Sequence, residues 1–527
     1  MNPSHWRRTL LLSLLVALAA PPSVARAAGP PAAPNVVLFF IDTLRADRCH
    51  CYGARRETTP NLDLMAARGT LFENAYSQAS WSLPSYTTIF SSLYPPVHGV
   101  TTTLKAVGTQ IELLSEIYAR YGYQSAAFVA GGHLTPAFGL NRGFDLYQST
   151  SYGASLSFTV PPALKWLDEN GAKPFLLLVH GYDVHCPYSP PLGFSELYDP
   201  GYQGVVHQPG FLRPEVLEKI QDLTYSSGAL ASFRSSYAQA PGQSWRRRML
   251  LPPIRPELGE LETDEPDWPT ALGAPGQIGV QPVPVGPGGL PFKLPDFRET
   301  LAPADVEHLR AHYDGGLTYA DTWLGMFLEG LERRGLRDST IVLVAGDHGE
   351  ELGEHGRFGH GHNLWDGLLR VPLVMAGPGV AAGRRVRQTV ELADVAPTLL
   401  RLCTIPPSHK HQGRSLAGLL GPVPASEDSN RPGFAFETRA SSIHLGRWHL
   451  IVSRTSEDTD ALSDQLYDLS ADPTEQKNVS SANPEVVRKL RSQLQDYAEE
   501  FALKSQKAGT ATLGDDEKRF LKQFGYW

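Results

Sequence analysis

The segment NVVLFFIDTLRADR, residues 35–48, decides the fold of this 527-residue chain. Asn35–Ile41 is a continuous apolar run rich in β-branched and aromatic residues, as expected of a strand that is covered on both faces. Similar short runs recur and are mostly separated by helical stretches; they are Ser125–Val129, Phe175–His180, Thr340–Ala345 and Val371–Ala376. This alternation predicts an α/β fold with a largely parallel sheet sandwiched by helices.

Polar residues directly after two of these runs form a candidate metal site. In sheets of this class, ligands gather at the carboxyl ends of the strands. Asp42 ends the first run, and Asp347 and His348 follow Thr340–Ala345 in a glycine-flanked turn. These donors suit one divalent cation, because carboxylate oxygens favour Ca²⁺ and the imidazole admits Mn²⁺ or Zn²⁺. The acids that come next are expected to form a solvated face and a helix start rather than further ligands; they are Glu350, Glu351 and Glu354.

A serine lies between these clusters, in the segment SQASWSLPSYTT, residues 77–88. Pro84 favours the first position of a helix, so the turn Trp81–Leu83 is predicted at a helix N-terminus, where free N–H groups and the dipole stabilise an anion. Ser82 is then placed to meet a sulfuryl or phosphoryl group, although a metal or a base must activate its hydroxyl. Taken alone, the segment also agrees with Ser82 as a simple helix cap.

Composition and the start of the chain bound the class of protein. The chain is 42% hydrophobic and 19% charged, as in a soluble globular protein, and its net charge of -8 argues against nucleic acid as a partner. Arg7 and Arg8 precede the apolar run Thr9–Ala20, which predicts a secretory signal over residues 1–27 and an exported protein, periplasmic or secreted, without a stable membrane span after its removal. An N-terminal anchor is the alternative, although the run is shorter than the ~20 residues that a span needs.

Two regions depart from the α/β pattern of the main domain. Residues from about 190 to 298 become rich in proline and glycine and lack a helical period, so they are predicted to be an irregular insertion, either a lid or a linker. Residues 425–527 contain short strand-like pieces and an amphipathic helix near Pro484–Phe501, which predict a smaller C-terminal α+β subdomain. In the main domain, the clearest helix pattern covers about Pro303–Arg334.

Six segments resemble, in order, the motif series of the sulfatase family in the alkaline-phosphatase-like superfamily. They run from about Asn35 to Val479 and include VVLFFIDTLRADRCHCYG with SWSLPS, the pair His98-Gly99, HGYDVHCPYSPP, GDHGEELGEHG, LLRVPLVMAGPGV and QLYDLSADPTEQKNV. The resemblance implies an alkaline-phosphatase-like catalytic domain over residues 35–424. It also implies that the metal ligands are Asp42, Ser82, Asp347 and His348, with Ser82 in the nucleophile position.

The nucleophile segment departs from the family pattern. The usual motif is C-x-P-x-R, whose first residue, a cysteine or sometimes a serine, is oxidised to formylglycine. Here Ser82 and Pro84 are kept, but Tyr86 replaces the arginine, which belongs to the recognition motif of the maturing enzyme. An unmodified Ser82 would resemble the serine or threonine nucleophiles of phosphatase relatives. Thr43 and His348, where many sulfatases have aspartate and asparagine, resemble members that hydrolyse phosphonates and phosphodiesters.

Three histidines complete the site that the resemblance implies. His133 takes the place of the histidine in the element G-K-W-H-L, although Gly131 replaces its lysine; His185 matches a substrate-contacting histidine, and His360 stands where a lysine contacts the sulfate. Imidazoles supply charge to ester oxygens and a proton to a leaving alcohol. Two other histidines in these segments are expected to be structural, His98 and His362.

The sequence thus predicts a metal-dependent hydrolase of sulfate or phosphate esters that acts on a small-molecule or glycan substrate. The alternative is an inactive protein that keeps the sulfatase fold and binds an anion or a glycan, as the loss of the arginine and of two lysines would suggest. The joint retention of the four metal-site residues argues against it, because drift erodes a costly cluster of like charges. The sequence carries no signal for an oligomeric state.

Overall fold

The computed structural model describes residues 33–150, 154–203, 301–454 and 462–521, apart from residues 187, 192, 424, 516, 519 and 520. The predicted signal, residues 1–27, and the predicted insertion from residue 204 onward lie outside this part of the chain. The lid or linker role of the insertion therefore stays a prediction. From Pro34 onward, the described residues form one compact unit. No helix among the described residues is long and apolar enough to cross a bilayer.

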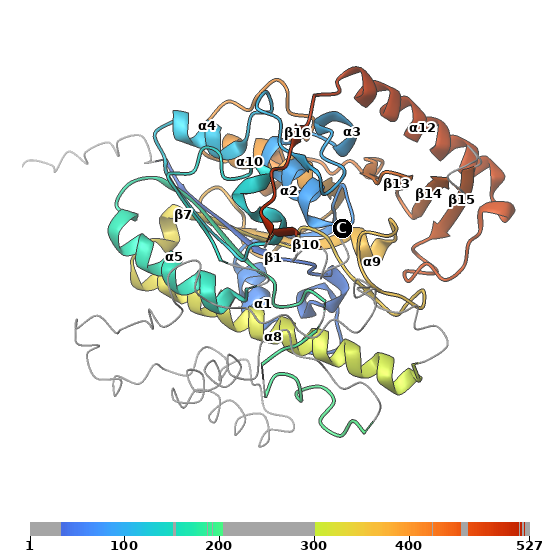
Figure 1. Ribbon diagram of the computed structural model, residues 1–527, viewed down its shortest axis with the longest axis horizontal. Helices are drawn as coiled ribbons and strands as arrows, with labels where there is room; N and C mark the ends of the chain where they lie inside the picture. The colour runs from blue at the N-terminus through green and yellow to red at the C-terminus, as the bar shows by residue number, and fades with distance from the viewer. Residues whose placement is uncertain are drawn as a thin grey trace, which may run out of the picture. The chain divides into compact units, whose positions relative to one another are not determined.

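An eight-stranded sheet forms the centre of this unit, with the strand order β11-β2-β10-β7-β1-β6-β4-β5 (Figure 1). The five predicted strands are all present in it, and strand β1 pairs in parallel with β6 and β7. Strand β10 runs antiparallel to β2 and β7, which an apolar run does not encode because it reads alike in both directions. The bounds are β1 Asn35–Ile41, β2 Thr70–Tyr76, β4 Gln124–Val129, β5 Leu146–Ser149, β6 Phe175–Gly181, β7 Thr340–Ala345, β10 Arg370–Ala376 and β11 Arg384–Glu391.

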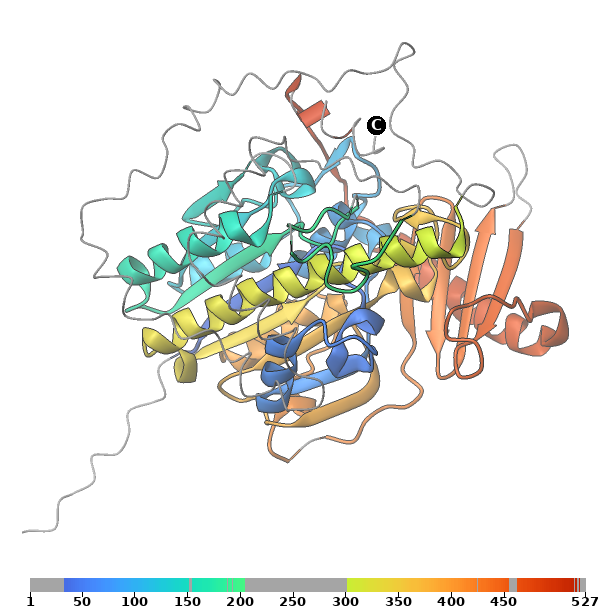
Figure 2. The same cartoon turned by 90° about the horizontal axis from the view of Figure 1, so that it is seen from below.

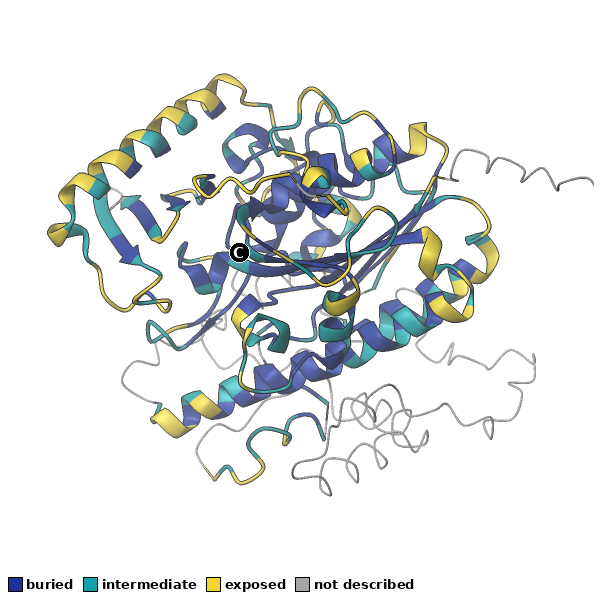
Figure 3. Cartoon of the chain, turned by 180° about the vertical axis from the view of Figure 1, so that it is seen from behind, coloured by how far each residue is buried: buried dark blue, intermediate teal, exposed yellow. Residues whose placement is uncertain are grey.

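Helices cover both faces of the sheet, so the predicted α/β architecture is confirmed. Side chains of β1 alternate between two cores, with Phe40 in one and Phe39 in the other. Figures 1 and 2 show the layers, and Figure 3 shows that the strands between them are buried. On one face lie α2 (Ser82–Ser91), α4 (Leu114–Arg120) and α10 (Val395–Leu402); on the other lie α1 (Pro60–Arg68), α5 (Leu156–Asn170) and α8 (Pro303–Arg333).

Helix α8 has nearly the bounds that its apolar period predicts, and it fixes the chain that follows β1. The buried Tyr313 of α8 donates a hydrogen bond to the Thr43 carbonyl at 2.8 Å and accepts one from the Arg45 N–H at 2.9 Å. Thr43 itself has φ 55, a left-handed conformation that is uncommon for a β-branched residue. The anchored, strained turn holds Asp42 at a defined position at the end of β1.

The C-terminal part contains the predicted strands and helix as a smaller subdomain. Four antiparallel strands form its sheet in the order β12-β13-β14-β15, and helix α12 (Pro484–Leu503) packs against β13 and β14. Figure 3 shows that the outer side of α12 is exposed. The boundary between residues 35–424 and 425–527 remains a prediction. The strand bounds are β12 Gly433–Phe436, β13 Ala440–Leu445, β14 Trp448–Arg454 and β15 Leu462–Asp468.

Candidate active site

Asp42, Asp347 and His348 meet at one edge of the sheet. Asp42 follows β1, and Asp347 follows β7, the strand that pairs with β1 in parallel, so their carboxyl ends lie side by side. One ligand atom from each of the three side chains lies within 4.8 Å of the others, and all three residues are buried. The structure therefore brings together the three residues that were predicted to hold a metal. With Ser82 they are called the carboxylate cluster below.

The two carboxylates of this cluster have the chemistry of a cation site. Asp42 Oδ1 and Asp347 Oδ2 are buried, and no hydrogen-bond partner for either atom exists among the described residues. Burial, together with the nearby charge of Asp42, raises the pKa of the Asp347 carboxyl well above its usual range. Two buried carboxylates at such close range repel each other unless a cation lies between them. With one imidazole added, this donor set fits a divalent metal ion.

Ser82 lies against this cluster at the start of helix α2. Its hydroxyl Oγ lies 3.4 Å from Asp42 Oδ2 and 3.3 Å from His348 Nε2. His348 Nδ1 lies 2.8 Å from the Gly349 carbonyl, to which it must donate its hydrogen, so Nε2 presents a lone pair toward Ser82. The free N–H groups of the first turn of α2 add positive potential at the same place.

Helix α2 begins two residues earlier than predicted. Ser82 is its first residue, so Pro84 is the third rather than the first. A proline is tolerated there because N–H groups of the first turn have no acceptor within the helix. Trp81 holds the N-cap position and no side chain caps the helix. The interpretation of Ser82 as a simple cap is therefore wrong, and its side chain faces the carboxylates instead.

His180 belongs to this site although it was interpreted only as the end of a strand. Its Nδ1 accepts a hydrogen bond from the Ala130 N–H at 3.3 Å, so its Nε2 donates to Asp42 Oδ2 at 3.1 Å. Burial alone would raise the pKa of Asp42, but this hydrogen bond, together with the nearby imidazoles of His348 and His185, holds the pKa well below its usual range. The signal was available, because a polar residue closes an apolar run beside β1.

Glu350 is a buried partner of the predicted catalytic histidines. Its Oε1 lies 2.9 Å from His360 Nδ1, and its Oε2 accepts a hydrogen bond from the Cys186 N–H at 3.3 Å. Burial raises the pKa of Glu350 to about 7. The ring of His360 lies 4.6 Å from that of His348 and 4.8 Å from that of His185. His185 and His360 thus border the cluster, and the carboxylate fixes the ring of His360 from behind.

The prediction that Glu350, Glu351 and Glu354 form a solvated face and a helix start is wrong. Glu351 is buried in strand β8 (Glu351–Leu352) and pairs with His355 at 3.0 Å. Glu354 pairs with the buried Arg45 at 2.9 Å. A run of glutamates resembles a solvated helix in sequence, but here each side chain has a cationic or imidazole partner that compensates its burial.

His133 lies near Ser82, and the neighbouring Gly132 packs closely against Tyr182. Its buried ring lies 5.2 Å from that of Trp81, next to Ser82. Gly132 has φ 62, and a Cβ added there would lie 2.1 Å from the hydroxyl oxygen of Tyr182, so no other residue fits. Burial lowers the pKa of His133 to about 3 and that of His185 to about 4. Without a ligand both rings are therefore neutral, and an anion bound beside them would favour their protonated forms.

His98 and Tyr86 are both buried among side chains of the main domain. His98, expected to be structural, is buried; its Nδ1 accepts a hydrogen bond from the Val100 N–H at 3.0 Å, and its Nε2 lies 3.2 Å from Thr88 Oγ1. Tyr86, which replaces the motif arginine, is buried between the rings of Phe40 and His180. Its hydroxyl has no hydrogen-bond partner among the described residues. Tyr86 therefore forms a wall of the site where the arginine would have placed a cation.

Glu437 of the C-terminal subdomain holds the turn that precedes the serine, and no sequence pattern indicated this. Its Oε1 accepts hydrogen bonds from the Ser80 N–H at 3.0 Å and from the Ser80 hydroxyl at 2.9 Å. Its Oε2 accepts a hydrogen bond from Trp81 Nε1 at 3.2 Å. Burial raises the pKa of Glu437 to about 7. The position of Ser82 thus depends on a side chain from the smaller subdomain.

Comparison with known proteins decides the family. Residues 34–405 match the model of the family described as Sulfatase. The chain belongs to the sulfatase family. This match confirms the family that the order of the motifs predicts. The protein is therefore an ester hydrolase. Residues 353–500 also match the model described as N-sulphoglucosamine sulphohydrolase, C-terminal.

Individual relatives agree over most of the chain. Arylsulfatase K of Rattus norvegicus is 26% identical, over 92% of the sulfatase and 82% of the rat protein. Arylsulfatase K of Mus musculus is 24% identical, over 92% and 84% of the two chains. A solved protein in complex with its substrate D-glucosamine-2-N,6-O-disulfate superimposes with TM-score 0.63 at 19% identity, covering 89% of the sulfatase and 98% of that chain. A phosphonate monoester hydrolase of Agrobacterium radiobacter gives TM-score 0.61 at 20% identity, covering 89% and 96%.

Proposed function

We propose that this sulfatase hydrolyses sulfate esters of small molecules or glycans, with Ser82 as the nucleophile and one divalent cation. The observation that carries the proposal is the position of Ser82 Oγ, which lies 3.3 Å from His348 Nε2 and 3.4 Å from Asp42 Oδ2 at the start of a helix. Asp42, Asp347, His348 and Ser82 would hold the cation, with Ca²⁺ first in expectation and Mn²⁺ or Zn²⁺ as alternatives. A cation there supplies the charge that activates a hydroxyl and stabilises ester oxygens.

The proposed reaction forms and then hydrolyses a seryl ester. The Ser82 hydroxyl, whose pKa a cation there would lower, loses its proton to water, and its Oγ attacks sulfur. The bond between sulfur and the ester oxygen breaks, and that oxygen takes a proton from a histidine and leaves as the alcohol. Water then attacks the sulfur of the seryl sulfate; one of its protons goes to the Ser82 oxygen and the other returns to the histidine, and sulfate is released. Tyr86 in place of the motif arginine supports an unmodified serine rather than formylglycine.

The histidines and two carboxylates have distinct proposed roles. His360 and His185 lie beside the cluster and are the proposed proton donors to the leaving oxygen, while His133 contacts the substrate from the side of Trp81. Glu350, His180 and Glu437 are positioning residues, because each bonds a group that would touch the substrate or the metal rather than the ester itself. We also propose export through the signal over residues 1–27.

Hydrolysis of three chromogenic esters tests this proposal. Turnover of p-nitrophenyl sulfate, p-nitrophenyl phosphate and bis-p-nitrophenyl phosphate is measured with and without EDTA. The expected result is turnover of the sulfate ester that EDTA abolishes and that Ser82→Ala loses. Ser91→Ala is the matched control, because Ser91 is buried in the same helix and donates only to the Thr87 carbonyl. Absence of EDTA-sensitive turnover on every ester would contradict the proposal and favour an anion-binding protein.

Two further results distinguish sulfate from phosphate esters as substrates and serine from formylglycine as the nucleophile. Turnover of the phosphate esters alone would overturn sulfate as the substrate while leaving the role of Ser82 intact. The intact mass of the active-site peptide distinguishes serine from formylglycine, because oxidation of serine to the aldehyde removes two hydrogens. We expect the mass of the unmodified peptide.

A further inference from the structure

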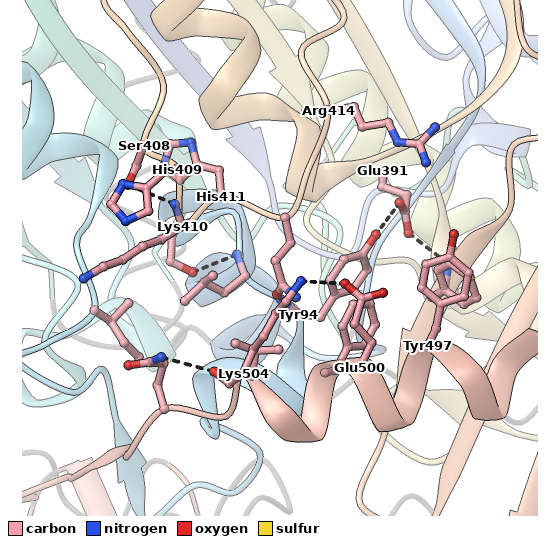
Figure 4. Close-up of a pocket in the computed structure, with 18 of the residues that line it drawn as sticks. Tyr94, Glu391, Ser408, His409, Lys410, His411, Arg414, Tyr497, Glu500 and Lys504 are labelled. Atoms are coloured by element: carbon pink, nitrogen blue, oxygen red, sulfur yellow. Dashed lines mark hydrogen bonds and ion pairs between the residues drawn. The ribbon is translucent and has the colours of Figure 1, made fainter.

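A second site lies at the other end of helix α2. A pocket of about 490 Å³ is lined by Ser91, the last residue of α2, and by none of the active-site residues discussed above. The ten residues of α2 separate it from Ser82 by about 14 Å. Figure 4 shows the loop residues Ser408–His411 across the pocket from Tyr497 and Lys504 of the C-terminal segment. This space is called the α12 pocket below; its size is typical of a site for a small molecule.

The α12 pocket carries uncompensated positive charge. Its three acidic residues already have cationic partners, whereas Lys410 and Arg414, which are both exposed, have no acidic partner among the described residues. Positive charge at the mouth of a pocket attracts and retains an anion. The paired acids are Glu112, with Arg120 at 2.7 Å; Glu391, with Arg431 at 3.4 Å, a guanidinium that also pairs with Asp394 at 2.7 Å; and Glu500, with Lys504 at 2.5 Å.

The wall of the pocket also contains hydrogen-bond donors that lack acceptors. Arg431 is 3% exposed, and its Nη1 has no acceptor in the part of the chain that the structure describes. The same holds there for Gln412 Nε2, and the two ring nitrogens of His411, one a donor and one an acceptor in the neutral ring, also lack partners. Buried donors are rarely left unsatisfied in folded proteins. If these side chains turn toward the pocket, a ligand rich in oxygen acceptors, with the waters that it orders, would satisfy them.

An aromatic surface faces the same space. Tyr497 lines the pocket and is half-buried, with its ring 4.3 Å from that of Phe434, so its ring face is held in place. Tyr94 stacks on Phe501 at 4.4 Å in the floor. Small-molecule sites combine such aromatic walls with a few polar groups that set the orientation of the ligand.

We propose that the α12 pocket binds an anionic sugar. Lys410 or Arg414, which lie on different sides of the pocket (Figure 4), contacts the oxyanion, a sulfate or a carboxylate, while polar groups of the wall meet ring hydroxyls and the ring lies against Tyr497. A bare inorganic anion would leave the aromatic wall and most donors unused, and a neutral sugar would leave the two cations uncompensated. The site is for binding and has no catalytic group, and it does not depend on the reaction proposed above.

Calorimetric titration of the full-length sulfatase tests the proposal. The probes are glucose 6-sulfate, glucuronate, glucose and inorganic sulfate. The pocket variant is Lys410→Ala with Arg414→Ala, and the control is Lys165→Ala with Lys173→Ala, two exposed lysines whose removal changes the net charge equally. The expected result is binding of glucose 6-sulfate or glucuronate that is at least tenfold weaker in the pocket variant and unchanged in the control.

Each other outcome overturns the proposal. Absence of binding to the unsubstituted protein does so, as does equal affinity in the pocket and control variants, which would place the sugar in the carboxylate cluster. Glucose binding as tightly as glucose 6-sulfate would exclude the role of the cations, and inorganic sulfate binding as tightly would exclude the sugar. Since both side chains are exposed, unfolding is not expected; Lys410→Glu alone repeats the test with a single change.

Discussion

The two ends of helix α2 carry sites of opposite character. At the Ser82 end, the side chains are buried, mainly acidic and contributed by residues that directly follow strands β1 and β7. At the Ser91 end, the α12 pocket is open and has surplus positive charge. It is lined by helix α12, by the loop that follows α10 and by the end of α2. The sheet topology brings the carboxylates of the first site together, and only the turn before Ser82 depends on Glu437 of the C-terminal subdomain. The second site, by contrast, exists only because that subdomain docks on the main domain. A single helix thus joins a site dictated by local pattern to one dictated by long-range packing.

The largest effect is expected from Asp347→Asn at the Ser82 end. Loss of one carboxylate removes a cation ligand, so turnover should fall roughly a thousandfold or more. In metal-free protein, the same change should raise the melting temperature, because burial and Asp42 disfavour the charged form of Asp347. Turnover and thermal melting in EDTA measure the two effects, with the exposed Asp338→Asn as the control. A metal-free variant that melts lower than the parent would contradict the repulsion argument.

Glu437→Ala should cost about a hundredfold in kcat with little change in KM. The substitution frees Ser80 and Trp81, which set the position of Ser82, and small misplacements of a nucleophile have effects of this size. Glu437→Gln keeps one acceptor and should recover part of the loss. Steady-state kinetics are compared with those of Glu485→Ala, an exposed position in the same subdomain. If KM alone changed, Glu437 would contact the substrate instead of positioning the serine.

His180→Asn should weaken metal binding by about tenfold to a hundredfold. The imidazole orients Asp42 through a buried hydrogen bond, and partners of metal ligands have effects of this magnitude. Titration of EDTA-treated protein with Ca²⁺ or Mn²⁺, followed by recovery of turnover, measures the change. His98→Asn, in a buried site that bonds Val100 and Thr88 instead, is the comparison. Equal metal affinity in both variants would remove His180 from the site.

The smallest effect on chemistry is expected at the Ser91 end. Lys410→Ala with Arg414→Ala should change turnover of p-nitrophenyl sulfate by less than about twofold, because both charges are exposed at the far end of α2 and act on the active site through water and salt. The same variant should bind the anionic sugar at least tenfold more weakly. A large loss of turnover on this small ester would show that the two ends of α2 are coupled, and the contrast between them would fail.

The same contrast explains what the sequence could and could not predict. Polar residues that come directly after apolar runs share one edge of a parallel sheet, which predicts the positions of Asp42 and Asp347; His180 follows the same rule. Glu350 was misjudged because its histidine partner is ten residues away and glutamate-rich segments are usually solvated. Glu437 and the α12 pocket depend on contacts between segments hundreds of residues apart, which no local pattern encodes.

The most direct test of the central claim is a crystal structure of the sulfatase grown with Mn²⁺, with the ion located by its anomalous scattering. The account predicts one peak within about 2.0–2.6 Å of oxygens of Asp42 and Asp347, with His348 Nε2 and Ser82 Oγ completing its surroundings. A fully folded protein with no ion between these side chains, or with the ion bound elsewhere, would contradict it.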